Sequence, residues 1–289
     1  MQSMSGSGDL DWVILTTGAR PSEVERPVAS IEESDADTRI VVVSNGAGDL
    51  AEMDLGHATV VTSSENLGVP AGRDLGLRST SSPVVGFLDD DAVLLGDAAA
   101  QIAGAFREDP TLGAVALHMA GDHGQVTRRH VPVVGTQAPH DRQEVAYFVG
   151  CAHALRRAAY DDAGGYFGDL FYSHEEIELC WRLIDAGWTI RFLDASAYHP
   201  TTEIGRHRRG WWMTGRNRVW IARRTLPWPV AVIHVASWFV GGLVRAPTAA
   251  ARRAYVRGWL AGWRSRVEHD PIRWATVWRL TRLGRPPLI

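Results

Sequence analysis

The chain has 289 residues, 45% hydrophobic and 22% charged, so it can bury the core of one large domain or of one domain with an extension. Its net charge of −3 conceals two unlike parts, because the first 200 residues carry 13 arginines against 30 acidic residues and the remainder carries 17 against 3. Two cysteines are too few for a disulfide framework and the polar N-terminus lacks a signal-peptide layout, which argues against a secreted protein, so we expect a cytoplasmic one.

Apolar runs alternate with helical patterns over the first 120 residues. Runs rich in β-branched residues predict strands at 12–18, 39–46, 58–62, 83–88 and 112–118. Helical patterns lie between them, at 23–34, 66–77 and 97–106. This alternation is typical of βαβ units, so we expect an α/β fold with a mostly parallel central sheet flanked by helices.

Two common nucleotide-binding signatures are missing from the sequence. A Gly-x-x-x-x-Gly-Lys loop is excluded because the chain has no lysine, and no Gly-x-Gly-x-x-Gly follows the first predicted strand. The sequence therefore indicates neither a P-loop enzyme nor a dinucleotide-binding fold.

Three consecutive carboxylates, Asp89, Asp90 and Asp91, follow the strand predicted at 83–88. Ligands of open α/β sheets bind beyond the carboxyl ends of the strands, and alternate residues of an extended segment share a face. Asp89 and Asp91 can therefore point into one crevice, where Mn²⁺ or Mg²⁺ would relieve their repulsion and bind a diphosphate. The alternative is a solvated acidic turn that caps the next helix.

A second acidic cluster, at residues 175–178, opens a segment with apolar residues at helical spacing. Ser173 and Glu176 match a capping box, which is a purely structural alternative. Capping does not account for three glutamates in this turn. It also leaves unexplained His199, which follows a strand predicted at 189–193 and so lies where ligands gather.

The acidic clusters belong to an ordered set of motifs: Asn66-x-Gly68, Ala71-Gly72-Arg73, the acidic triplet, Gly150-Cys151-Ala152, Gly164-Gly165-Tyr166, the stretch 171–182, Ala186-Gly187-Trp188 and His199. In this order, the motifs resemble the family 2 inverting glycosyltransferases, of the bacterial rhamnosyl- or galactosyltransferase type, over residues 12–224. The resemblance implies the GT-A fold.

The resemblance implies roles for individual residues. The metal ligands would be Asp91, Asp89 and His199, and the general base Glu176, with Glu175 as the alternative. The nucleotide and donor would contact Thr16, Asn45, Arg73, Asp89 and Asp90. Candidate contacts to the diphosphate or acceptor are Arg216, Arg218 and Trp181.

The implied reaction is a metal-dependent, inverting transfer of a hexosyl or deoxyhexosyl group from a UDP- or dTDP-linked donor. The acceptor would be a hydroxyl of a glycan, a lipid-linked (polyprenyl) compound or a small molecule. Transfer would be non-processive, since the sequence lacks a Gln-x-x-Arg-Trp motif and multiple spanning helices. The alternatives are a nucleotidyltransferase on a related fold and a non-catalytic nucleotide-sugar-binding or membrane-docking protein.

We divide the chain into a catalytic domain at 1–205 and an Arg/Trp-rich helical extension at 206–289. In the catalytic domain, residues 1–95 would bind the nucleotide and residues 96–205 the acceptor. The boundary follows the change from acidic to basic composition.

The extension holds nine of the twelve tryptophans, and its apolar run at 230–244 is shorter than a membrane-spanning helix. Tryptophans flanked by arginines favour peripheral contact of residues 230–283 with the inner face of a membrane. Packing on the enzyme's own acidic half and homodimer formation are the alternatives, and we expect no nucleic-acid partner.

Overall fold

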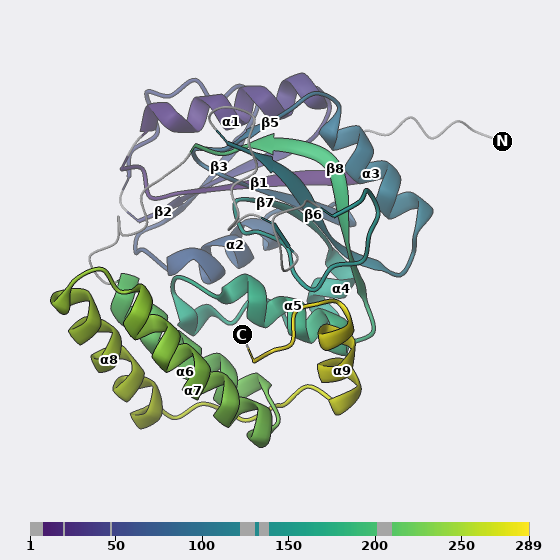
Figure 1. Ribbon diagram of the computed structural model, residues 1–289. Helices are drawn as coiled ribbons and strands as arrows, with labels where there is room; N and C mark the ends of the chain where they lie inside the picture. The colour runs from purple at the N-terminus through teal and green to yellow at the C-terminus, as the bar shows by residue number, and fades with distance from the viewer. Residues whose placement is uncertain are drawn as a thin grey trace.

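The computed structural model describes residues 8–19, 21–46, 48–121, 131–132, 139–200 and 210–288. Eight strands within these ranges form one sheet, in the order β3-β2-β1-β4-β7-β6-β8-β5. Helices cover both faces of the sheet, and the C-terminal helices form a further layer below it (Figure 1). The predicted α/β class and the helical extension are confirmed.

The four strands of the N-terminal half pair in parallel, in the order β3 (Thr59–Ser63), β2 (Ile40–Asn45), β1 (Leu10–Thr16) and β4 (Val84–Asp89). The helices of this half are α1 (Pro21–Ser34), α2 (Gly68–Arg78) and α3 (Ala98–Glu108). Trp12 and Ile14 join the core on one face of the sheet, and Val13 joins the core on the other. Burial on both faces explains the continuous apolar runs.

The other half of the sheet contains antiparallel strands that the sequence analysis missed. β7 (Ala152–Arg156) is antiparallel to both β4 and β6 (Leu112–Ala120). The two-residue β5 (Val93–Leu94) is antiparallel to β8 (Thr189–Tyr198), which itself runs parallel to β6. The β5–β8 pairing brings the residue after β8 back to the turn that follows β4.

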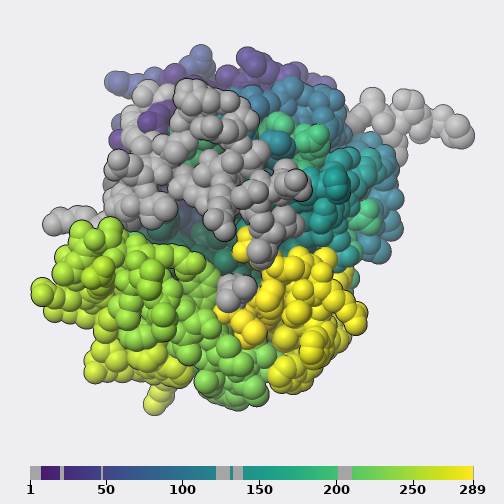
Figure 2. Space-filling view, viewed as in Figure 1, coloured from purple at the N-terminus to yellow at the C-terminus, as the bar shows by residue number. Residues whose placement is uncertain are grey.

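The lower face of the sheet is covered by α2, α4 (Arg157–Asp162) and α5 (Glu175–Asp185). Below them lie α6 (Gly210–Thr225), α7 (Trp228–Arg245), α8 (Ala249–Arg264) and α9 (Trp274–Arg282), the green and yellow layer of Figure 2. Val219, Val230 and Leu280 of these helices belong to the same core cluster as the lower face of the sheet. The extension therefore packs on the part of the chain that contains the sheet; the predicted boundary at 205–206 lies outside the described residues.

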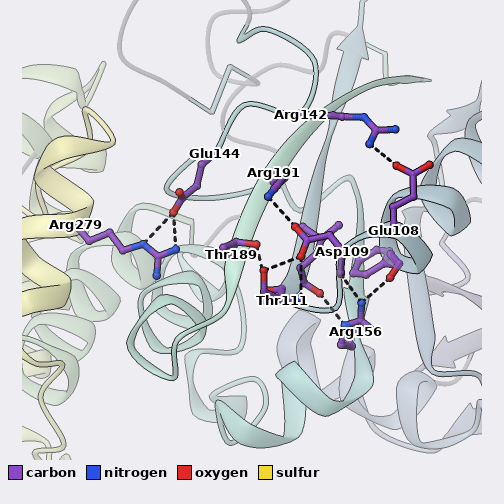
Figure 3. A network of polar contacts seen from close by, with 11 residues as sticks. Glu108, Asp109, Thr111, Arg142, Glu144, Arg156, Thr189, Arg191 and Arg279 are labelled. Atoms are coloured by element: carbon purple, nitrogen blue, oxygen red, sulfur yellow. Dashed lines mark hydrogen bonds and ion pairs between the residues drawn. The ribbon is translucent and has the colours of Figure 1, made fainter.

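Ion pairs and hydrogen bonds fix α9 to the acidic half. Arg279 donates two hydrogen bonds to one Glu144 oxygen, at 2.9 and 2.6 Å (Figure 3), and the Thr276 hydroxyl donates to Asp185 at 2.6 Å. Packing of basic helices on the enzyme's own acidic half, one of the open alternatives, is therefore correct for α9.

By length and composition, α7 reaches what a membrane-spanning helix needs, whereas the sequence analysis expected the apolar run to be too short. The difference arises because α7 begins at Trp228 and continues to Arg245, so the helix has 18 residues. One such helix is weak evidence for a span, but only 28% of it is buried, so much of its apolar surface is open.

Candidate active site

Two carboxylates and one imidazole meet at the ends of β4 and β8. The ligand atoms of Asp89, Asp91 and His199 all lie within 4.8 Å of one another. His199 Nε2 lies 3.2 Å from Asp91 Oδ1, and its Nδ1 lies 2.8 Å from the carbonyl oxygen of Pro200. Because a carbonyl only accepts, Nδ1 carries a hydrogen and Nε2 can face a cation. These residues fit a divalent ion such as Mn²⁺ or Mg²⁺.

The charge at this cluster favours a cation. Burial opposes a charge on His199, but its hydrogen bond to Asp91 and the charges of Asp89 and Asp91 outweigh burial and raise the pKa of His199. An environment that stabilises a proton on this imidazole, next to two carboxylates, also stabilises a metal ion in place of that proton.

One buried guanidinium joins the cluster of Asp89, Asp91 and His199 to the two glutamates of α5. Arg73 of α2 is 3% exposed; its Nη2 donates to Asp89 Oδ1 at 3.0 Å and to the Gly150 carbonyl at 2.7 Å. Its Nη1 lies 3.5 Å from Glu176 Oε1 and 3.8 Å from Glu175 Oε1. Carboxylates from two different elements thus share one positive charge. The predicted contact of Arg73 with the nucleotide stays a prediction, since these hydrogen bonds go to protein atoms.

The two glutamates at the start of α5 differ in accessibility. Glu175 is 3% exposed, and burial, reinforced by the neighbouring Glu176, raises the pKa of Glu175 to about 8. The side chain of Glu176 is 20% exposed, and its Oε1 lies 1.9 Å from where a β-carbon on Gly150 would be. Glycine at position 150 therefore makes room for Glu176. Of the two, Glu176 is the carboxylate that a substrate can reach.

The turn that precedes α5 does not form the capping box considered above. His174 occupies the N-cap and makes no capping hydrogen bond through its side chain. Phe171, Ser173 and His174 have φ values of 62°, 77° and 74°. Left-handed conformations cost residues with a β-carbon about 1–3 kcal/mol each, so contacts from outside the turn must hold it.

A buried amide of α6 supplies those contacts. Asn217 is 0% exposed, and its Nδ2 lies 2.8–3.0 Å from three carbonyl oxygens of the turn, those of Leu170, Tyr172 and Ser173. Its Oδ1 accepts from Arg216 Nε at 2.9 Å, so only this orientation of the amide matches every donor to an acceptor. Sequence reasoning missed Asn217, because a lone asparagine in an Arg/Trp-rich stretch carries no motif.

Two predicted nucleotide-binding residues have structural partners. The Thr16 hydroxyl, at the end of β1, donates to Asp90 Oδ2 at 2.7 Å, which joins β1 to the acidic turn after β4. Asn45, 2% exposed, accepts from the Leu67 amide at 2.8 Å and donates to the Gly68 carbonyl at 3.0 Å. Asn45 therefore fixes the loop before α2, and its contact with a nucleotide stays a prediction.

Three further predicted residues lie where α5, α6 and α7 meet. Trp181 is 5% exposed and packs edge-on against His234 at 5.8 Å between ring centroids. Arg218 lies 3.4 Å from the centroid of the Trp238 ring, and burial lowers its pKa to about 9. Arg216 donates to two carbonyls of the turn before α5, those of Asp169 and Leu170. Contacts of these residues with a diphosphate or acceptor stay predictions.

His153 supports this site and was also missed. Its ring lies between those of Phe87 and Phe148, at centroid distances of 4.9 and 4.2 Å. Its Nδ1 lies 3.1 Å from the Gly150 carbonyl oxygen, and its Nε2 lies 3.0 Å from the Tyr166 hydroxyl. Burial lowers the pKa of His153 well below its usual value, so a neutral imidazole orients Gly150 beneath Glu176. No periodicity or motif distinguishes a core histidine of this kind.

The eight-stranded mixed sheet with helices on both faces has the GT-A fold, as comparison with solved structures shows. GalNAc-T7 with UDP, GalNAc and Mn²⁺ matches 87% of this chain and 54% of its own, with a TM-score of 0.63 and 12% identity. Staphylococcus aureus TarS 1–349 in complex with UDP-GlcNAc matches 86% and 79%, with a TM-score of 0.60 and 14% identity. Identities this low show the fold alone.

The family model for glycosyl transferase family 2 matches residues 12–164, more than half of the chain. The chain therefore belongs to glycosyl transferase family 2, as the resemblance predicted. The pre-mycofactocin glycosyltransferase of Mycobacterium tuberculosis is 29% identical over 249 residues, which cover 77% of this chain and 47% of that protein. The chain thus spans about half the length of the curated relatives it matches.

Proposed function

We propose that the protein is a metal-dependent, inverting glycosyltransferase that moves one sugar from a nucleotide-diphosphate donor to an acceptor hydroxyl. The observation that carries this proposal is the arrangement around Arg73. Its guanidinium lies 3.0 Å from Asp89 of the metal cluster and 3.5 Å from Glu176. Carboxylates from two different elements therefore lie against one guanidinium, which supports assigning them the two tasks that a single displacement requires.

The chemistry follows from this arrangement. Asp89, Asp91 and His199 would hold the metal ion, which when bound stabilises the negative charge that develops on the diphosphate. Glu176 accepts the proton of the acceptor hydroxyl as that oxygen attacks the anomeric carbon. The bond from this carbon to the diphosphate breaks on the opposite face and the electron pair leaves with the nucleotide, so configuration is inverted.

The donor is proposed to be UDP- or dTDP-linked and to carry a hexosyl or deoxyhexosyl group. Neighbouring structures hold UDP, UDP-GlcNAc or GDP-Man, which supports a nucleotide sugar without selecting among the bases. We propose non-processive transfer to a glycan, a lipid-linked compound such as a polyprenyl derivative, or a small molecule. We place the reaction in the cytoplasm, at the inner face of the membrane.

Calorimetric titration of UDP, dTDP and GDP, with and without Mn²⁺, tests the donor site. We expect one nucleotide to bind tightly, and only when the metal is present. Asp91→Asn should abolish this metal-dependent binding. Asp194→Asn is the matched control, since the Asp194 side chain is 71% exposed and lies outside the metal cluster. Metal-independent binding, or none by any nucleotide, would contradict the proposal.

A further inference from the structure

Helix α7 has two apolar faces, and only one of them packs on the enzyme. Val230, His234 and Val235 on the inner face are buried, and His234 Nδ1 lies 2.7 Å from the Pro287 carbonyl oxygen. The outer face leaves large apolar side chains exposed, namely Trp228, Val232, Ile233, Val240 and Val244. Residues at this spacing lie on one side of a helix.

The outer face is long and continuous. Val240 is 62% exposed and Val244 77%, and Arg245, at its end, is the first charged residue of the helix. An 18-residue helix is about 27 Å long, so this apolar stripe, from Trp228 to Val244, runs nearly the length of α7. Soluble monomers rarely expose contiguous apolar surface of this kind, which marks a protein or membrane interface.

The part of the chain around this face is basic. Helix α8 packs mainly along α6 and meets the C-terminal half of α7, where the Tyr255 hydroxyl donates to the Trp238 carbonyl at 2.6 Å and Arg252 Nε donates to the Leu243 carbonyl at 3.2 Å. Residues 204–267 contain no aspartate or glutamate. On the outside of α8, Arg253 and Arg257 are exposed.

These arginines differ from Arg279 of α9. Arg279 of α9 is neutralised by Glu144 (Figure 3), whereas in the part of the chain that the structure describes no carboxylate pairs with Arg253, Arg257 or Arg264. Unneutralised arginines beside an open apolar stripe complement a surface that combines hydrocarbon with negative charge.

We infer that the outer face of α7, together with the exposed arginines of α8, docks on an anionic lipid bilayer. Helix α7 lies in the plane of the membrane, with its apolar stripe at the boundary of headgroups and acyl chains and the arginines against lipid phosphates. This inference deepens the membrane location in the proposed function and does not depend on the transfer reaction. It assigns the contact to the outer face of α7 and to the exposed arginines of α8.

The contact is peripheral because the inner face of α7 is occupied. Trp181 of α5 packs against His234, and the ring of Tyr255 lies against Gly242, where a β-carbon would come within 2.1 Å of it. Insertion of α7 across a bilayer would break these contacts and leave Arg218 without the Trp238 ring. In-plane docking keeps all of them.

Flotation of the purified full chain with lipid vesicles tests this surface. Vesicles of phosphatidylcholine alone are compared with vesicles that also contain phosphatidylglycerol, at moderate and at high salt. We expect binding to the anionic vesicles only, with release at high salt. Val240→Glu and Arg253→Glu/Arg257→Glu should each weaken binding about tenfold or more. Val60→Glu is the matched control, since Val60 is 42% exposed on the edge strand β3.

Several outcomes would overturn the inference. Equal binding to neutral vesicles, or no binding, removes the anionic bilayer as the partner. Protein that stays on the vesicles at high salt and needs detergent for release indicates a spanning helix. A wild-type dimer that Val240→Glu dissociates, without vesicle binding, assigns the face to a second copy. Nucleotide binding with Mn²⁺, measured on every variant, shows separately whether the donor site is intact and whether the proposed function holds.

Discussion

The Oε1 atom of Glu176 occupies the space next to Gly150 that any larger residue would need, since a β-carbon there would lie 1.9 Å away. The atom in conflict is the far end of a flexible side chain, so Glu176 can swing aside without moving the backbone. Stability and the position of this carboxylate can therefore be separated experimentally.

Gly150→Ala should reduce sugar transfer about 100-fold, because displacing a reacting group by about 1 Å costs that much. The free energy of unfolding should change by less than about 1 kcal/mol. Turnover of the best-binding sugar nucleotide and urea unfolding provide the two measurements. A variant that loses stability and activity in proportion would show that the β-carbon disturbs the fold instead.

Glu176→Gln should lower turnover by about 10²–10⁴-fold, since an amide cannot take the proton of the acceptor hydroxyl. Binding of the nucleotide with Mn²⁺ should stay unchanged, because the metal cluster lies on other elements. Glu175→Gln is the control and should retain transfer. If Glu175→Gln is the inactive variant, the base is Glu175.

Glu175→Gln should also flatten the dependence of stability on pH. The pKa of Glu175 is about 8 in the folded protein against an ordinary value of 4.5, so the folded state binds the extra proton between these values. Its contribution to stability is complete below pH 4.5 and is lost as pH rises through 8. Urea unfolding of wild type from pH 5 to 9 should show this loss, on the order of a few kcal/mol, and the variant should not.

Asn217→Asp should impair catalysis while sparing the donor site. A carboxylate has no hydrogen to donate to the carbonyls of Leu170, Tyr172 and Ser173, so the turn relaxes and Glu176 shifts. We expect kcat to fall about tenfold or more, with KM for the sugar nucleotide unchanged.

The control for Asn217→Asp is Tyr255→Phe, which removes a hydrogen bond within the extension but leaves the turn alone. Hydrogen exchange of residues 168–176 should rise in Asn217→Asp and not in the control. If both variants lose turnover in step with thermal stability, Asn217 has only a general structural role.

The sequence predicted the parallel half of the sheet because strands buried on both faces, such as β2, are continuously apolar. It also predicted that Asp89, Asp91 and His199 lie close together, since each is at or just after a strand end and the sheet brings strand ends together; a metal ion between them stays a prediction. These features depend on local patterns and on a general rule of α/β topology.

Other parts of the structure depend on contacts that no local pattern records. β5 has only two residues, and β7, with the sequence Ala-His-Ala-Leu-Arg, lacks the β-branched residues that revealed the five-residue β3. Arg73 is buried because α2, β4 and α5 meet around it. The sequence did not reveal this, since a guanidinium that binds carboxylates in the interior has the same local sequence as one that binds a phosphate. The apolar run of α7 was visible in the sequence. The sequence did not show that one face of this helix would stay exposed to solvent.

The hydrogen bonds from Asn217 also bear on how this chain can vary and be engineered. The turn that precedes Glu175 and Glu176 is held by a residue some forty positions later, in the basic extension. A tail exchanged with that of a relative would bring its own residue at this position, so the turn at 170–174 and α6 have to be exchanged together. The compositional boundary near residue 205 is thus a poor place to cut, since a fragment that ends there leaves three carbonyls of its active-site turn without their donor.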